Sequence, residues 1–150
     1  MGETTRLTFR QLTIDDADAA ALHDLLCFGE HDAWSREAFF YAAKSFRNEF
    51  LVAELDGKII ACAGAVIHSD TAEIQTLSVD PNFHGRGIGK IMLTKLIEAV
   101  KNRGATFVIL EVRPSNTTAI KLYDSLGFRI VDRIENFYDD EDAWIMAREF

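Results

Sequence analysis

Cysteine, proline and long apolar runs are all scarce in this sequence, and each shortage excludes a class of protein. The 150 residues include only two cysteines and two prolines, beside 48% hydrophobic residues. A chain that is so apolar and so poor in proline is not disordered. Cys27 and Cys62 have neither a CxxC partner nor histidines at zinc-ligand spacing, so we expect buried thiols in a reducing compartment and no metal. The longest apolar stretch, 59–67, is far shorter than the roughly 20 residues of a membrane helix, so we expect no membrane span.

The N-terminal segment and the length of the chain indicate what kind of unit to expect. Residues 1–20 turn acidic and lack the continuous apolar core of a secretory signal, so we expect a cytoplasmic protein. No repeat, low-complexity tract or linker divides the chain. We therefore predict a single domain over residues 1–150, long enough to bury about two thirds of its unfolded surface.

Basic residues are outnumbered by acidic ones, 16 to 24, and they are unevenly distributed. The segment 84–103 carries five Lys or Arg residues against the single acid Glu98, in a chain whose net charge is −8. Such a basic island predicts a local anion site, although a solvated helix face would have the same composition. The acidic remainder argues against a surface that binds nucleic acid.

Hydrophobic periodicity predicts an α/β fold. Alternation and short apolar runs predict strands over 6–12, 50–54, 58–68, 71–79, 106–112, 128–134 and 143–147. Asp56-Gly57 predicts a tight hairpin after the second of these strands. Helical spacing predicts helices that begin at Asp15, Ser35, Ile88 and Asn116, and the first of them carries Ala19, Leu22, Leu25 and Leu26 on one face. We expect a central mixed sheet, mostly antiparallel, of about seven strands flanked by about four helices, with a strand–helix–strand crossover late in the chain.

The segment 79–90, VDPNFHGRGIGK, places three of the nine glycines between a predicted strand and a predicted helix. Glycines let backbone N–H groups approach an anion, and a helix N-terminus favours negative charge, so the segment is typical of a phosphate-binding loop. A turn that serves only to reverse the chain fits equally well. A Walker loop is excluded because positions 84 and 91 are His and Ile, and a dinucleotide fingerprint is excluded because position 90 is Lys.

From His84 to Gly89 the sequence HGRGIG resembles the acetyl-CoA pyrophosphate loop of the GNAT N-acetyltransferase superfamily. The family has Gln or Arg at its first position, where this chain has His84. We expect the change to be tolerated, because the loop works mainly through main-chain donors. The resemblance implies that acetyl-CoA binds along the preceding strand and this loop. The residues implied are Leu77, Ser78, Val79, Gly85, Arg86, Gly87, Ile88, Gly89 and Lys90.

A second block, LEVRPSN at 110–116 with LYDSLGF at 122–128, resembles one branch of that superfamily, the RimI-like ribosomal-protein-alanine N-acetyltransferases. Trp34-Ser35 upstream and the tail at 136–146 resemble the same branch, so the likeness extends over nearly the whole chain from Leu7. It implies acetyl transfer to the N-terminal amino group of a protein, with a small-subunit ribosomal protein as partner. It also implies that Asn116 contacts acetyl-CoA.

The same block contains Glu111 and Tyr123, whose side chains suit proton transfer. An α-amino group has a pKa of about 7.7–8.0, so a base must deprotonate it before it attacks a thioester. Glu111 is such a base if burial raises its pKa, and Tyr123 can protonate the departing thiolate. Without the resemblance, Tyr123 would be interpreted as a core residue and Glu111 as a solvated charge. By the resemblance they are the catalytic proton acceptor and donor.

Two other functions remain open at this level: a GNAT enzyme that acetylates a small amine or a lysine side chain, and a non-catalytic acetyl-CoA-sensing module. The acidic run 139–142 suggests a surface that attracts a cationic amino terminus, although a solvated turn would have the same sequence. We expect a monomer or weak dimer that uses acetyl-CoA and a protein N-terminus, without metal, nucleic acid or membrane.

Overall fold

The computed structural model describes residues 6–150. Its strands are β1 (Leu7–Gln11), β2 (Asn48–Leu55), β3 (Lys58–His68), β4 (Thr71–Val79), β5 (Phe107–Val112), β6 (Arg129–Tyr138) and β7 (Glu141–Glu149). Its α-helices are α1 (Ala17–Asp32), α2 (Arg36–Lys44), α3 (Ile88–Asn102) and α4 (Thr117–Ser125). Short 3₁₀ turns precede α1 and follow β4. In this part of the chain no helix is long and apolar enough to cross a membrane.

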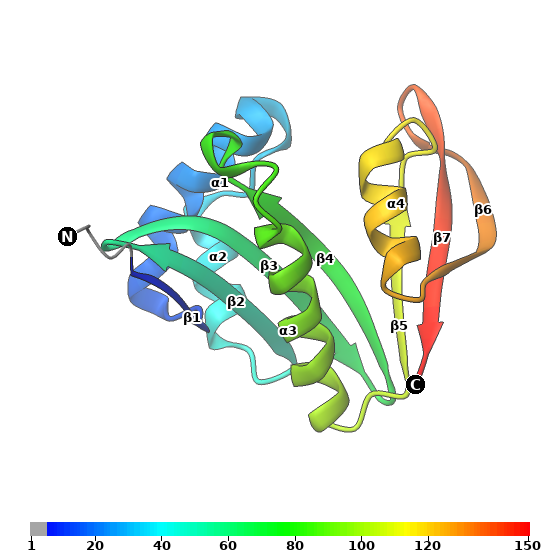
Figure 1. Ribbon diagram of the computed structural model, residues 1–150, viewed down its shortest axis with the longest axis horizontal. Coiled ribbons are helices and arrows are strands. Elements are labelled where there is room, and N and C mark those ends of the chain that lie inside the picture. Colours follow the sequence, from blue (N-terminus) through cyan, green and yellow to red (C-terminus); the bar gives the residue numbers. More distant parts are fainter. Residues whose placement is uncertain (1–5) are drawn as a thin grey trace.

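All seven strands form one sheet in the order β1-β2-β3-β4-β5-β7-β6 (Figure 1). Neighbours are antiparallel except β4 and β5, which are parallel because the chain returns through α3. The predicted mixed α/β fold is thereby confirmed.

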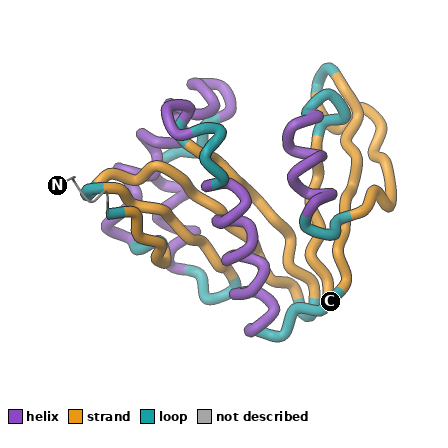
Figure 2. Tube along the Cα trace, in the orientation of Figure 1, coloured by secondary structure: helices purple, strands orange, loops and turns teal. Residues whose placement is uncertain are grey.

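Among the described strands β4 and β5 are the only parallel pair, and the sheet splits between them. β4 and β5 are in register over three residue pairs, from Thr71 opposite Phe107 to Glu73 opposite Ile109. Beyond Glu73 the two strands diverge, so the sheet forms a V with β1–β4 in one arm and β5, β7 and β6 in the other (Figures 1 and 2). A bulge in the β3–β4 pairing, between Gly64 and Ala65, lies next to this divergence.

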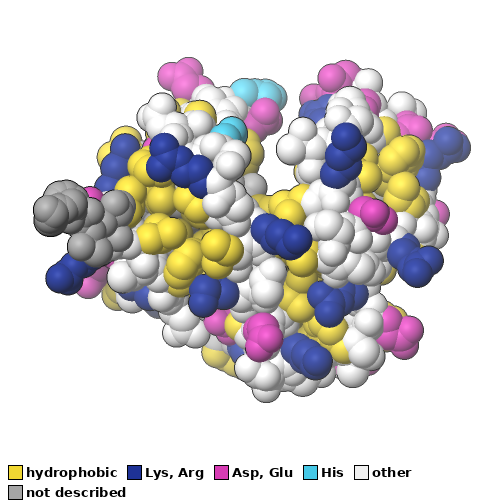
Figure 3. All heavy atoms as spheres, in the orientation of Figure 1, with side chains coloured by type: hydrophobic (Ala, Val, Ile, Leu, Met, Phe, Trp, Pro, Cys, Tyr) yellow, Lys and Arg dark blue, Asp and Glu magenta, His cyan; other side chains and the backbone are white. Residues whose placement is uncertain are grey.

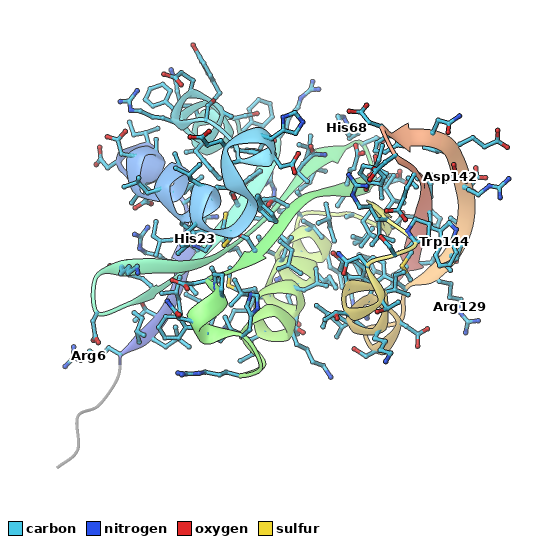
Figure 4. The ribbon with its side chains drawn as sticks, turned by 90° about the horizontal axis from the view of Figure 1, so that it is seen from above. Arg6, His23, His68, Arg129, Asp142 and Trp144 are labelled. Carbon is cyan, nitrogen blue, oxygen red and sulfur yellow. The ribbon has the colours of Figure 1, made fainter. Side chains whose placement is uncertain are left out.

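Helices cover both faces of the sheet. Seen from above, α1 and α2 lie on one side, and α3 and α4 on the other (Figure 4). The larger core lies on the α3 side and includes Met92, Leu96 and Phe128, all fully buried. A smaller core under α1 and α2 is centred on Phe39 and Phe50.

Local sequence signals explain several of the element boundaries. Ser35 caps α2, since its Oγ accepts a hydrogen bond from the Ala38 N–H at 3.1 Å. Asp56 and Gly57 have φ values of 50° and 85°, the left-handed pair of a tight hairpin, as predicted. Gly64 is required by packing, because a Cβ there would lie 2.3 Å from the Phe50 ring. The last two strands are longer than predicted.

The apolar face predicted for α1 points away from the core. Leu22, Leu25 and Leu26 are 68%, 42% and 53% exposed. The buried side of the helix instead carries Ala17, Ala20, His23 and Asp24. Small side chains allow α1 to approach the sheet closely, and Asp24 Oδ2 accepts a hydrogen bond from the Trp34 N–H at 2.7 Å.

Both cysteines are free thiols. Cys62 is fully buried in the smaller core, as predicted, whereas Cys27 on α1 is only half-buried. Burial raises the pKa of both, that of Cys27 to about 11, so neither is an activated nucleophile.

Candidate active site

A pocket of about 250 Å³ occupies the space where β4 and β5 separate. Strand β4 contributes residues 74–77, β5 contributes Leu110 and Glu111, and α4 contributes Tyr123. The end of α1 and the loop after it add Phe28, Asp32 and Trp34. The space-filling view shows this region as a hollow between the two arms of the V (Figure 3).

Glu111 lies on β5, on the face of the sheet opposite α3. Its neighbours Leu110 and Val112 point into the larger core, so strand alternation directs Glu111 to the other side. Burial and the nearby Glu73 carboxylate together raise the pKa of Glu111 above its ordinary value. A carboxylate in this state is a stronger base than an exposed one.

Tyr123 reaches the same pocket from the other face of the sheet. Its ring is 9% exposed and packs against Phe128, with ring centroids 5.9 Å apart. Burial, with a smaller contribution from Tyr138, raises the pKa of Tyr123 to about 12. The phenol therefore keeps its proton at neutral pH and can act as a donor. The structure brings Glu111 and Tyr123 to one pocket, as their proposed roles require.

The edge of β4 beyond Glu73 has no β5 partner, so main-chain groups there are available to a ligand. Leu77 and Val79 are half-buried against the α3 core. Ser78 faces the opposite side, where its Oγ lies 2.9 Å from Nε2 of the buried His23. Any contact between Ser78 and acetyl-CoA would therefore use its main chain.

The glycine loop leads from β4 into α3. Gly85 and Gly87 have φ values of +78° and +77°, and no atom lies within 4 Å of the position that a Cβ would take. Gly89 has a helical conformation and would meet only ordinary contacts. Two left-handed glycines before a helix N-terminus, with open space around them, fit the close approach of a pyrophosphate.

Side chains of this loop differ in where they lie. Ile88 is buried in the larger core, so only its main chain can contact a ligand. Lys90 is exposed, and the Arg86 guanidinium lies 5.1 Å from the Phe83 ring. His84, which departs from the family pattern, hydrogen-bonds through Nε2 to the Val79 carbonyl at 2.8 Å and so ties the loop to β4.

Asn116 is the N-cap of α4. Its Oδ1 accepts a hydrogen bond from the Ala119 N–H at 3.2 Å. The structure thus gives Asn116 a role in capping the helix that carries Tyr123. Its contact with acetyl-CoA stays a prediction.

The acidic run at the β6–β7 turn is largely engaged by the protein itself. Arg113 lies 2.6 Å from Asp140 and 3.3 Å from Glu141, and Glu141 also accepts from the Ser115 hydroxyl at 2.7 Å. Arg113 also stacks on Tyr138, with 4.1 Å between the guanidinium and the ring centroid. These contacts leave less negative charge to attract an amino terminus than the sequence suggests.

Several residues in or beside the pocket were not predicted from the sequence, above all Glu73, which neighbours Glu111. It lies beside Glu111 only because β4 and β5 pair in parallel, and no local signal in the sequence predicts that register. Trp34 was noted as part of the family resemblance, and it packs against Phe39 and Phe50 at the pocket wall. Within residues 6–150 no three His, Cys, Asp or Glu side chains are grouped to hold a metal ion.

Comparison with known proteins agrees with this geometry. The acetyltransferase (GNAT) family profile matches residues 19–128. The ribosomal protein bS18-alanine N-acetyltransferase of Salmonella typhimurium is 39% identical over 76% of this chain and 79% of its own length. The N-alpha-acetyltransferase RimI of Mycobacterium tuberculosis is 33% identical over 98% of this chain and 95% of its own length. The crystal structure of the Escherichia coli ribosomal-protein-S18-alanine N-acetyltransferase superposes with a TM-score of 0.87 at 32% identity, over 96% of this chain and 94% of that one.

Proposed function

This chain belongs to the acetyltransferase (GNAT) family, and we propose that it acetylates the α-amino group at the N-terminus of a protein. Membership makes it an acetyl-CoA-dependent N-acetyltransferase, so the resemblance drawn from the glycine loop and from residues 110–128 is confirmed. Relatives from Salmonella typhimurium and Escherichia coli are named as alanine N-acetyltransferases of a ribosomal protein. We propose the same class of acceptor here, and a single domain that carries out the whole reaction.

The observation that carries the proposal is the meeting of Glu111 and Tyr123 in one pocket from opposite faces of the sheet. The glycine loop lies at the far end of the β4 edge that opens onto this pocket. Acetyl-CoA, bound along that edge, would place a thioester between the base and the acid. The residues that would hold it are the main chain of 77–79, the loop 85–90 and Asn116.

Proton transfer follows from the two side chains. Glu111 accepts a proton from the acceptor ammonium, directly or through a water, and the free amine then attacks the thioester carbonyl. The N–C bond forms, the C–S bond breaks, and Tyr123 donates the proton that ends on sulfur. The attacking nitrogen loses a second proton, which restores the Tyr123 phenol, and Glu111 releases the first proton to solvent, so the products are the amide, the CoA thiol and one H⁺. No acyl-enzyme is required, because the amine attacks the acetyl group directly.

Glu111→Gln and Tyr123→Phe test these roles. Removing a proton-transfer group costs about 10²–10⁴ in rate, so we expect each variant to lose at least 100-fold in kcat. Both changes preserve shape, so we expect the affinity for acetyl-CoA, measured by calorimetry, to change less than about threefold. Turnover is followed as release of CoA thiol with a free N-terminal alanine peptide.

An exposed strand glutamate provides the matched control. Glu149 ends β7 opposite Phe107, and Glu149→Gln removes the same charge without touching the pocket. We expect it to turn over at the wild-type rate. Undiminished turnover in both Glu111→Gln and Tyr123→Phe would refute the assigned roles.

A further inference from the structure

A second carboxylate, Glu73, lies at the vertex of the V. It is the last residue of β4 in register with β5, opposite Ile109. Side chains of paired residues project from the same face of a sheet, and alternation returns Glu111 to that face two residues beyond Ile109. Glu73 and Glu111 therefore lie on one face at the point where the two strands begin to separate.

The two carboxyl groups are neighbours on this face of the sheet, and Glu73 is half-buried. Two carboxylates side by side repel each other when both are charged, so the neighbouring Glu73 favours the protonated form of Glu111. The nearby Glu73 adds to burial in raising the pKa of Glu111.

The other charged and titratable groups around Glu111 come from three elements. Tyr138 on β6 interacts with Glu111 and carries Arg113 on the face of its ring. Asp32 at the end of α1 and Tyr123 on α4 line the same pocket. The guanidinium of Arg113 is already paired with Asp140 and Glu141. Glu73 is therefore the group to which Glu111 is most directly coupled.

Resting on the role proposed above for Glu111, we propose that Glu73 is a positioning residue for it. The Glu73 carboxylate places negative charge beside Glu111 at the vertex of the cleft and so increases the basicity of Glu111 toward the acceptor ammonium. A base is most effective when its proton affinity approaches that of the group it deprotonates. An isolated glutamate, with a reference pKa of about 4.3, is poorly matched to an α-amino group at about 7.7–8.0. Glu73 reduces this mismatch.

Glu73→Gln is the central variant, because it preserves the shape of the side chain but removes its charge. Glu73→Asp keeps the charge on a shorter side chain, and Glu149→Gln is the matched control on a distant strand. The first readout is a ¹³C carboxyl NMR titration of the full chain without substrate, with the Glu111 signal assigned through Glu111→Gln. The second is the pH profile of kcat/KM with a free-amine peptide.

We expect the pH midpoint of the Glu111 titration to be lower in Glu73→Gln than in wild type. In Glu73→Asp at least half of that decrease should be absent, and in Glu149→Gln the midpoint should equal the wild-type value. The acid limb of kcat/KM should move to lower pH with it, and the plateau should fall about tenfold, a fraction of what loss of the base itself would cost. A Glu111 midpoint that is the same in Glu73→Gln and wild type would overturn the proposal. A loss of rate with an unshifted pH profile would also overturn it, since that is what a merely structural role produces.

The two readouts, the titration and the pH profile, distinguish a failure of this inference from a failure of the proposed function. The titration needs no acceptor, so a wild-type chain that acetylates no peptide contradicts only the proposed function. A shifted midpoint in that case would still support the pairing of Glu73 with Glu111.

Discussion

At the scale of single residues, the base that we propose at Glu111 lowers the stability of the folded chain. Its pKa is raised in the folded state by burial and by Glu73. Below the unfolded pKa of about 4.3 the group is protonated in both states. As pH rises from there through the raised folded value, the unfolded chain binds fewer protons than the native one, and stability is lost.

We therefore expect Glu111→Gln to be more stable than wild type at pH 7, by about 0.5–2 kcal/mol, as is common when a charge kept for function is removed. The difference should shrink as the pH falls and disappear well below the reference pKa of about 4.3, where Glu111 is protonated in the folded and the unfolded chain. Urea denaturation across this range measures it. A stability difference that does not vary with pH would contradict the raised pKa.

At the scale of elements, the glycine loop provides a matched pair of substitutions. Gly87 is left-handed with φ +77°, whereas Gly89 is helical and has room for a Cβ. A side chain in the left-handed region costs about 1–2 kcal/mol, so we expect Gly87→Ala to weaken acetyl-CoA binding about tenfold. Gly89→Ala should bind normally and gain roughly 0.5–1 kcal/mol of stability from helix propensity. Calorimetry measures both affinities, and equal losses in the two variants would show that the left-handed geometry is not what binds the cofactor.

The elements also show what sequence can and cannot predict. Strand and helix positions, the Asp56-Gly57 hairpin and the Ser35 cap follow from local residue chemistry, and the structure has them all. The face of α1 that packs on the sheet could not be predicted. The helix is apolar on both sides, and its buried side consists of small residues, His23 and Asp24. Glu73 lies near Glu111 because β4 and β5, which α3 connects, pair in one particular parallel register. Local sequence patterns carry no information about that register.

At the scale of the whole molecule, the V shape of the sheet suits the proposed reaction, in which two substrates must meet. We propose that acetyl-CoA binds along the β4 edge and the glycine loop, where Arg86 and Lys90 carry positive charge in a chain of net charge −8. Glu111 approaches the pocket from the α1–α2 face, and Tyr123 from the α3–α4 face. A base on one face and an acid on the other fit a transfer in which the amine and the thioester enter from different sides.

The most direct test of acetyl transfer to a protein N-terminus is CoA thiol release with a short peptide that carries a free N-terminal alanine. The same peptide with a blocked amino terminus but an internal lysine, and a panel of polyamines, serve as comparisons. We predict turnover with the free peptide and none above background with the blocked peptide or the polyamines. Turnover with the lysine or the polyamines, and none with the free α-amine, would contradict the account.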